Sequence, residues 1–135
     1  MFDNEINLLK KDILSRFGED KPLYVDFEGE KCIICEVDSR GWFHLDNGAI
    51  TGVVNLKPYL RPMSSMTEKE KDELYTAMDW YGAIDENGNV ETRGQEKVYS
   101  ETFCQYTDWL DSNFFDWRGL IPLDLALEAT EGMYK

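Results

Sequence analysis

The sequence predicts an α+β fold, in which a small, curled antiparallel sheet of about four strands is flanked by one N-terminal and two C-terminal helices. Three observations lead to this class. Apolar residues recur at helical spacing near the N-terminus, short apolar-polar alternations between tight turns follow, and helical spacing returns after residue 67. At 135 residues the chain has the length of a single domain, 1-135, with a sheet half (1-63) and a mainly helical half (64-135).

The first predicted element is an amphipathic helix from Asp3 to Phe17. Apolar residues repeat there every three or four positions, Asp3 or Asn4 provides the N-cap, and Gly18 provides the stop. We place four charged residues of this helix on its solvent side: Lys10, Lys11, Asp12 and Arg16.

Four strand-like runs come next. Tight turns separate them, and the last turn contains Asn47-Gly48, the strongest short hairpin signal. Short antiparallel strands joined in this way predict a strongly curled sheet or a small open barrel. The runs are Leu23 to Phe27, Lys31 to Val37, Trp42 to Leu45, and Ala49 to Leu56.

The connection between the two halves runs from Asn55 to Leu74. Because Pro58 and Pro62 fix φ and lack an N–H, residues 53–63 are expected to leave the sheet as an irregular arm. Thr67 followed by Glu70 forms a capping box, which predicts a helix from Glu68 to about Tyr81.

The C-terminal half is predicted to be mainly helical. A polar hairpin or loop about Asn87-Gly88 leads into a second long helix, Gln95 to Phe114. The tail from Leu120 to Leu127 is too apolar to remain free in water, so it must dock.

Two stretches, KPYLRPMSSMTEKEK and WLDSNFFDWRGLIPLDLALEATEGMYK, resemble an uncharacterised family of small proteins of gut Bacteroidota and their phages and mobile elements. The resemblance covers the connection and the last thirty or so residues, and covers the N-terminal strands and middle loop poorly. It implies a bacterial or phage cytoplasmic protein and carries over no catalytic residue.

The charge is strongly acidic, with 27 acidic against 14 basic residues and a formal net charge of −13. Such a chain would be repelled by nucleic acid and by anionic membranes. The charge permits two other roles: it keeps the protein soluble, which is the favoured interpretation, or it attracts a basic protein partner. No apolar run is long enough to span a bilayer, and the N-terminus lacks a signal-peptide pattern. Since three cysteines do not suggest a disulfide framework, a cytoplasmic location is expected.

Three sets of residues could carry metal or catalytic chemistry. Cys32 and Cys35 form a C-x-x-C, but on a strand they point to opposite faces, and a zinc site would have to recruit His44 and Cys104. Both are therefore interpreted as buried structural cysteines. His44 alternates with Phe43 and Leu45, which places it on the face shared with Trp42 and Asp46, and it is interpreted as a partly exposed sheet residue that is hydrogen-bonded to a neighbour. No metal or cofactor is predicted.

A second set resembles a calcium loop that begins at Asp85 and ends at Glu96. Val90 stands where the turn needs glycine and Arg93 brings a positive charge, so a polar hairpin tip is the preferred interpretation. The third set could pair carboxylates for acid/base work, although a solvated outer helix face is favoured. Its members are Glu96, Glu101, Asp108, Asp111 and Asp116.

Four aromatic residues exceed what a helix stripe requires: Trp80, Trp109, Phe115 and Trp117. Either they cradle the apolar tail, which is the favoured interpretation, or they bind a partner. The leading functional hypothesis is a protein-protein interaction module without enzymatic activity. The alternatives are an acidic inhibitor that imitates nucleic acid and blocks a host defence protein, and a hydrolase that uses paired carboxylates.

Overall fold

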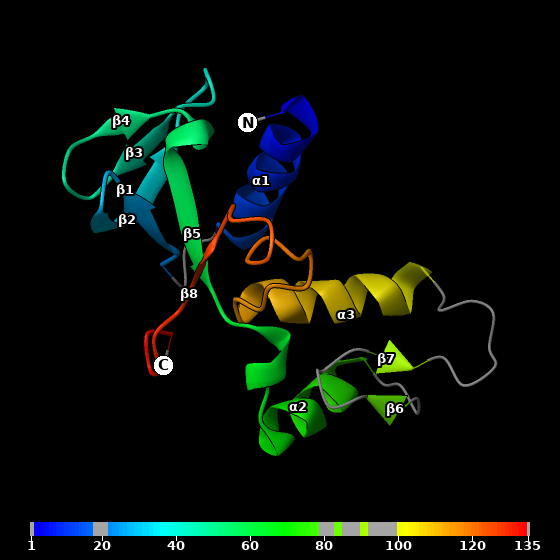
Figure 1. The fold of residues 1–135 in the computed structure, drawn as a ribbon. Helices are drawn as coiled ribbons and strands as arrows, with labels where there is room; N and C mark the ends of the chain where they lie inside the picture. The colour runs from blue at the N-terminus through cyan, green and yellow to red at the C-terminus, as the bar shows by residue number, and fades with distance from the viewer. Residues whose placement is uncertain (1, 18–21, 79–82, 85–89, 92–99, 135) are drawn as a thin grey trace. The chain divides into compact units, whose positions relative to one another are not determined.

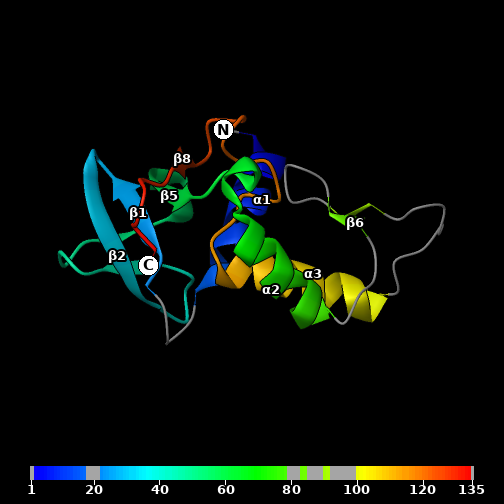
Figure 2. The same cartoon turned by 90° about the horizontal axis from the view of Figure 1, so that it is seen from below.

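The structure is a computed structural model that describes residues 2–17, 22–78, 83–84, 90–91 and 100–134. Figures 1 and 2 show its ribbon from two sides. The chain divides into two compact units: unit 1 joins Met1–Leu60 to Arg118–Lys135, and unit 2 is Arg61–Trp117. Unit 2 is thus inserted between the two chain segments that build unit 1.

Unit 1 contains a six-stranded sheet with the strand order β4-β3-β2-β1-β5-β8. All neighbouring strands are antiparallel except β5 and β8, which are parallel. The α+β class is therefore confirmed, while the sheet is larger than the predicted four strands and is mixed. The strands are β1 (Tyr24–Phe27), β2 (Glu30–Val37), β3 (Phe43–Leu45), β4 (Ile50–Thr51), β5 (Leu56–Leu60) and β8 (Leu127–Glu128).

Strand β5 is the main departure from the sequence prediction. Residues 53–63 do not form an irregular arm: after the short 3-10 helix η1 (Val53–Asn55), the chain returns to the sheet between β1 and β8. Pro58 lies opposite Val25 of β1, whereas β8 pairs only with Tyr59 and Leu60. The alternating burial of β5 explains its place in the sheet, because every second side chain enters the core.

Helix α1 (Asp3–Arg16) agrees with the prediction in extent but not in its cap. The N-cap is Phe2, whose N–H donates to the Glu5 carboxylate at 3.1 Å, so neither Asp3 nor Asn4 caps the helix. Leu9 and Ile13 are fully buried. The predicted stop, Gly18, lies outside the described residues.

The solvent-side assignment of Asp12 and Arg16 is wrong. Lys10 and Lys11 are exposed as expected, but Asp12 and Arg16 are buried. The Asp12 carboxylate accepts hydrogen bonds from Arg16 Nε at 2.9 Å, Arg16 Nη2 at 2.8 Å and Arg118 Nη1 at 2.7 Å. This ion cluster can be buried because each charge has an opposite charge in contact with it.

The C-terminal segment docks on unit 1, as the apolar character of residues 120–127 predicted. Leu120, Leu125 and Ala126 are buried, and the segment continues into β8. The Tyr134 hydroxyl donates to the Tyr59 carbonyl at 2.7 Å and accepts from the Tyr24 N–H at 3.1 Å. Burial of this phenol, the largest cause, raises the pKa of Tyr134.

Unit 2 begins with a short 3-10 helix, η2 (Met63–Ser65), and contains α2 (Glu68–Met78) and α3 (Ser100–Ser112). The capping box is confirmed: the Thr67 N–H donates to Glu70 Oε1 at 3.1 Å, and the Glu70 N–H donates to Thr67 Oγ1 at 3.2 Å. Arg61 binds both Glu70 oxygens at 2.6 and 2.7 Å, and this hydrogen-bonded pair is the main cause of the lowered pKa of Glu70.

The core of unit 2 lies between α2, α3 and the segment after α3. Its buried members are Met66, Leu74, Leu110 and Phe115. Helix α3 ends at Ser112, two residues before the predicted end, because Phe114 adopts a left-handed conformation with φ of 64°. Strands β6 (Ala83–Ile84) and β7 (Val90–Glu91) form an antiparallel pair, while their predicted turn at residues 87 and 88 lies outside the described residues.

No helix in the described part of the chain has both the length and the apolar character needed to cross a membrane.

Candidate interaction surface

The aromatic residues predicted from the sequence to bind a partner are part of the core of unit 2, as far as the structure describes them. Trp109 stacks on Phe115 with ring centroids 5.8 Å apart, and Phe115 is fully buried. The Trp117 indole N–H donates to Asp111 Oδ1 at 2.9 Å. Trp80 lies outside the described residues. Only Trp109 and Trp117 of this set are partly exposed, and their contact with a partner stays a prediction.

The expected solvated acidic face of the second long helix is wrong at two of its described positions. Asp108 is exposed, but Asp111 and Asp116 are buried. The buried Asp111 carboxylate accepts a hydrogen bond from the Trp117 indole, which is how a buried polar group is normally satisfied. The same bond fixes the indole against the core. The side chains of Glu96 and Glu101 are outside the described part of the structure.

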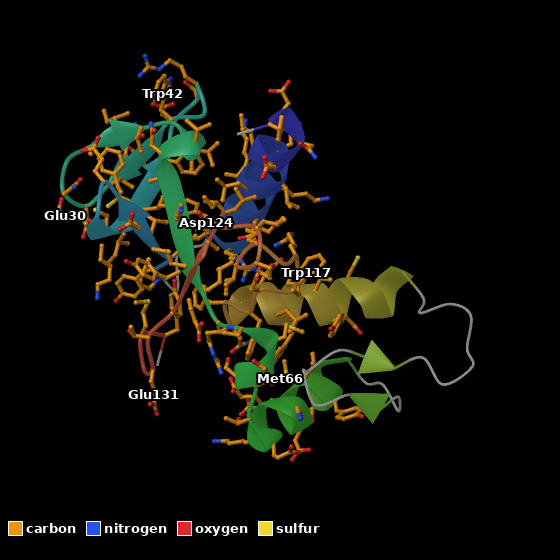
Figure 3. All side chains as sticks on the ribbon, viewed as in Figure 1. Glu30, Trp42, Met66, Trp117, Asp124 and Glu131 are labelled. Carbon is orange, nitrogen blue, oxygen red and sulfur yellow. The ribbon has the colours of Figure 1, made fainter. Side chains whose placement is uncertain are left out.

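A different set of apolar residues is exposed at the β4 end of the sheet in unit 1. Trp42, Ile50 and Val54 leave 45%, 53% and 47% of their surfaces accessible to solvent. We call these three residues the Trp42 surface. Figure 3 shows Trp42 beside the turn that leads into β3.

The hairpin of β3 and β4 explains why this surface faces solvent. Leu45 donates to the Ala49 carbonyl at 2.9 Å, and the register then pairs His44 with Ile50. Since side chains alternate along a strand, Phe43 and Leu45 enter the core, while the other face carries Trp42, His44 and Ile50. A Cβ on Gly52 would lie 3.9 Å from Trp42 Cζ3, so the indole ring lies beside this glycine.

The turn before β3 is organised by one carboxylate. Asp38 Oδ1 accepts from the Arg40 N–H at 2.9 Å and the Trp42 N–H at 3.1 Å, and Asp38 Oδ2 lies 2.9 Å from His44 Nε2. The Asp38 N–H also donates to the Trp42 carbonyl at 3.0 Å. These contacts, with the His44 hydrogen bond as the largest cause and the Trp42 N–H next, lower the pKa of Asp38 to about 2.

The interpretation of His44 as a hydrogen-bonded, partly exposed residue is confirmed. Besides Asp38, it meets Glu36 on the neighbouring strand, where His44 Nδ1 lies 3.5 Å from Glu36 Oε1. Sequence reasoning placed Trp42 on the strand face of the partly exposed His44, but it did not select Trp42 as a contact residue. The available signal was the alternation itself, because Trp42 shares its face with a histidine and not with the core residue Phe43.

The two cysteines of the C-x-x-C are separated as predicted. Cys32 is buried, and its burial is the first cause of its raised pKa, followed by the charges of three nearby carboxylates. The expected burial is wrong for Cys35, which is exposed at an irregularity in the pairing of β2 with β3. Among the described residues, no group of three or more His, Cys, Asp or Glu side chains is arranged to hold a metal ion.

The possible calcium loop, Asp85 to Glu96, lies almost entirely outside the described residues. Only Val90–Glu91 of this stretch is described, and it forms the strand β7.

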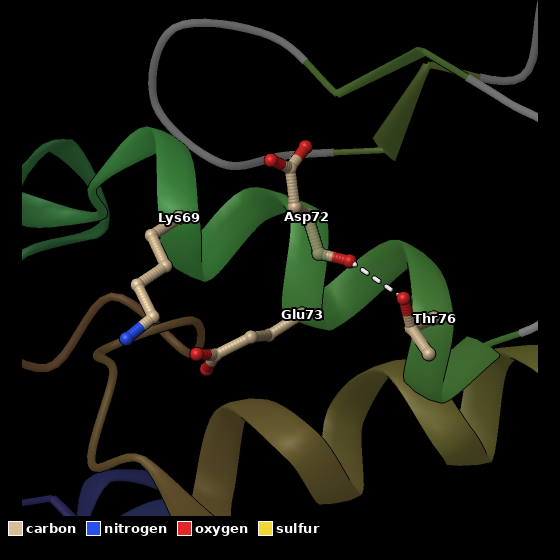
Figure 4. Close-up of a pocket in the computed structure, with 4 residues that line it drawn as sticks. All are labelled: Lys69, Asp72, Glu73 and Thr76. Carbon is tan, nitrogen blue, oxygen red and sulfur yellow. Dashed lines mark hydrogen bonds between the residues drawn. The ribbon is translucent and has the colours of Figure 1, made fainter.

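A shallow hollow of about 410 Å³ lies beside α2, and the described residues that line it are Lys69, Asp72, Glu73 and Thr76. All four are exposed. Figure 4 shows the carboxylates of Asp72 and Glu73 pointing to different sides of the helix. The Thr76 hydroxyl donates to the Asp72 carbonyl at 3.0 Å within the helix. Two carboxylates that point apart cannot share a proton or a water, so the described residues of this hollow offer no acid/base pair.

Comparison with known proteins finds no matching family model, no matching curated protein and no matching solved structure.

Proposed function

We propose that this protein is a non-enzymatic protein-protein interaction module, an accessory protein of a bacterial or phage genome, and that the Trp42 surface is its contact site. The observation that carries the proposal is the exposure of Trp42 and Ile50 on one face of the β3–β4 hairpin, followed along the chain by the exposed Val54 of η1. Tryptophan is enriched at the centres of protein interfaces, because it buries a large area when water is excluded.

The chemistry around the Trp42 surface indicates what the partner provides. Glu36 and Asp38 lie next to His44 on the same side of the hairpin, and the whole chain carries a formal net charge of −13. A partner that offers an apolar side chain surrounded by Lys or Arg would complement both the apolar residues and their acidic border. We therefore propose a basic protein as the partner.

The alternative of an inhibitor that imitates nucleic acid receives less support. Such a protein needs a continuous acidic face, whereas lysines lie among the carboxylates of unit 1. Across the sheet, Asp26 is opposite Lys31 on β2 and opposite Lys57 on β5. Lys57 Nζ also contacts Asp124 Oδ1 at 3.1 Å.

The test is affinity capture from a lysate of a Bacteroidota host at low and high salt, with mass spectrometry of the captured proteins. We expect Trp42→Ala to lose a partner that the unchanged protein retains. Leu123→Ala is the matched control, because Leu123 is an equally exposed apolar residue of unit 1 outside the Trp42 surface. Equal capture by all three proteins would overturn the assignment of the Trp42 surface. Loss with Trp109→Ala or Trp117→Ala alone would place the contact on unit 2.

A further inference from the structure

The histidine that borders the Trp42 surface has carboxylates at both ring nitrogens. His44 Nε2 lies 2.9 Å from Asp38 Oδ2, and His44 Nδ1 lies 3.5 Å from Glu36 Oε1. It is the single histidine of the chain. Histidine is the side chain that ordinarily changes charge between pH 5 and 8.

We infer that Asp38, His44 and Glu36 form a pH-sensitive clamp, in which the charge of the imidazole controls how firmly the turn that carries Trp42 is held. The clamp itself does not depend on the proposed function. Its consequence for partner binding rests on that proposal, because Trp42 is the centre of the proposed contact surface.

The pH dependence of the clamp follows from the number of N–H donors that the imidazole has in each charge state. A protonated imidazole has two N–H donors, so it can donate to Asp38 and Glu36 at the same time, whereas a neutral imidazole has one. After the proton is lost, one tautomer keeps the Asp38 bond and the other gives it up in favour of Glu36. The turn is therefore held most firmly below the imidazole transition and loosens as the pH rises through it.

The same carboxylate transmits this change to Trp42. Asp38 receives the backbone N–H groups of Arg40 and Trp42 on one oxygen while it binds His44 with the other. The lowered pKa of Asp38, about 2, keeps it ionised throughout the range in which histidine titrates. Losing the imidazole bond leaves the Asp38 carboxylate held only by the two backbone N–H groups on Oδ1, so the acceptor of the Trp42 N–H is held less firmly.

The other residues near the clamp do not change its expected pH dependence. Arg40 Nη2 reaches Asp38 Oδ2 at 3.5 Å, but its side chain is largely exposed and keeps its charge at every pH considered. From α1, Lys10 Nζ lies 4.0 Å from the position of a Cβ on Gly41, and it too remains charged. From β4, the neighbour of His44 is Ile50, which does not titrate.

The experiment is an NMR titration of the whole protein from pH 5 to 8.5, without any partner. The His44 ring C–H signal is the only one of its kind, and the Trp42 indole signal is assigned by its loss in Trp42→Phe. We expect the Trp42 signal to move with the same midpoint as His44, and to become independent of pH in His44→Gln.

Two substitutions test the carboxylates. Asp38→Asn should lower the midpoint of the His44 titration, because it removes the negative charge 2.9 Å from His44 Nε2. Glu36→Gln should lower it as well and leaves the backbone bonds of the turn intact. Glu30→Gln is the control, because Glu30 is an exposed acid on the same strand that contacts Asn47.

The inference is overturned if the Trp42 signal stays constant while His44 titrates, or if neither carboxylate substitution moves the midpoint. Because no partner is present, this result is separate from the capture experiment. If the Trp42 signal titrates with His44 but capture does not depend on Trp42, the clamp is supported and the contact surface is refuted. If capture depends on Trp42 but its signal does not titrate with His44, the contact surface is supported and the clamp is refuted.

Discussion

Replacing Asp12 by alanine tests how the C-terminal segment is attached to α1. The carboxylate is fully buried and accepts three hydrogen bonds, two from Arg16 and one from Arg118. Removing one side of a buried ion pair leaves the remaining charge without compensation and costs about 3–5 kcal/mol. Because the cluster joins a helix near the N-terminus to a residue of the C-terminal segment, this loss should destabilise unit 1 as a whole.

The loss can be measured by urea unfolding followed by far-UV circular dichroism. With a slope of about 2 kcal/mol per molar urea, the expected midpoint falls by roughly 1.5–2.5 M. Lys11→Ala is the matched control on the same helix, because Lys11 is exposed and such changes stay within about 0.5 kcal/mol.

Asp12→Asn separates charge from packing. The amide has nearly the same shape but carries no negative charge, so we expect it to destabilise almost as much as alanine. If the asparagine variant unfolds at the same urea concentration as Lys11→Ala, the charge of Asp12 does not stabilise the protein, and our account of the buried cluster is refuted.

Three further outcomes can be checked separately. Tyr134→Phe should lower the free energy of unfolding by about 1–2 kcal/mol, because it removes the hydrogen bond to Tyr59. Since the pKa of Tyr134 is raised in the folded protein, the contribution of its hydroxyl is complete below about pH 10 and is lost as the pH rises further. The unfolding midpoints of the two proteins should therefore converge at alkaline pH. Thr67→Ala should cost about 1 kcal/mol by removing the cap of α2, whereas Thr76→Ala in the same helix should change the urea midpoint little, and equal effects would contradict the capping role. A thiol reagent should label two of the three cysteines quickly and Cys32 slowly, because Cys32 is buried and its pKa is raised; three equal rates would contradict this placement.

Features determined by nearby residues could be predicted from the sequence. The capping box of Thr67 and Glu70 needs only residues three positions apart, and it fixed the start of α2 correctly. The separation of Cys32 from Cys35 followed from strand alternation in the same way. Both patterns are local, so no knowledge of distant segments was needed.

Features that depend on distant partners could not be predicted. Asp12 was assigned to solvent because its partner Arg118 lies 106 positions away in the sequence. Pro58 suggested an irregular arm, since nothing nearby in the sequence shows that β5 lies between β1 and a C-terminal strand. Strand alternation places Trp42 on the face of His44, but whether that face stays exposed depends on what the rest of the chain leaves uncovered.

The insertion of unit 2 has a consequence for the order of events during synthesis. The sheet of unit 1 needs β8, and β8 is made only after all of unit 2. Unit 2 can close earlier, because its two ends pair with each other: the Arg61 N–H donates to the Phe114 carbonyl at 2.7 Å, and the Asp116 N–H donates to the Arg61 carbonyl at 2.8 Å. On the ribosome, we therefore expect the segment in the middle of the chain to complete its fold before the unit that begins the chain.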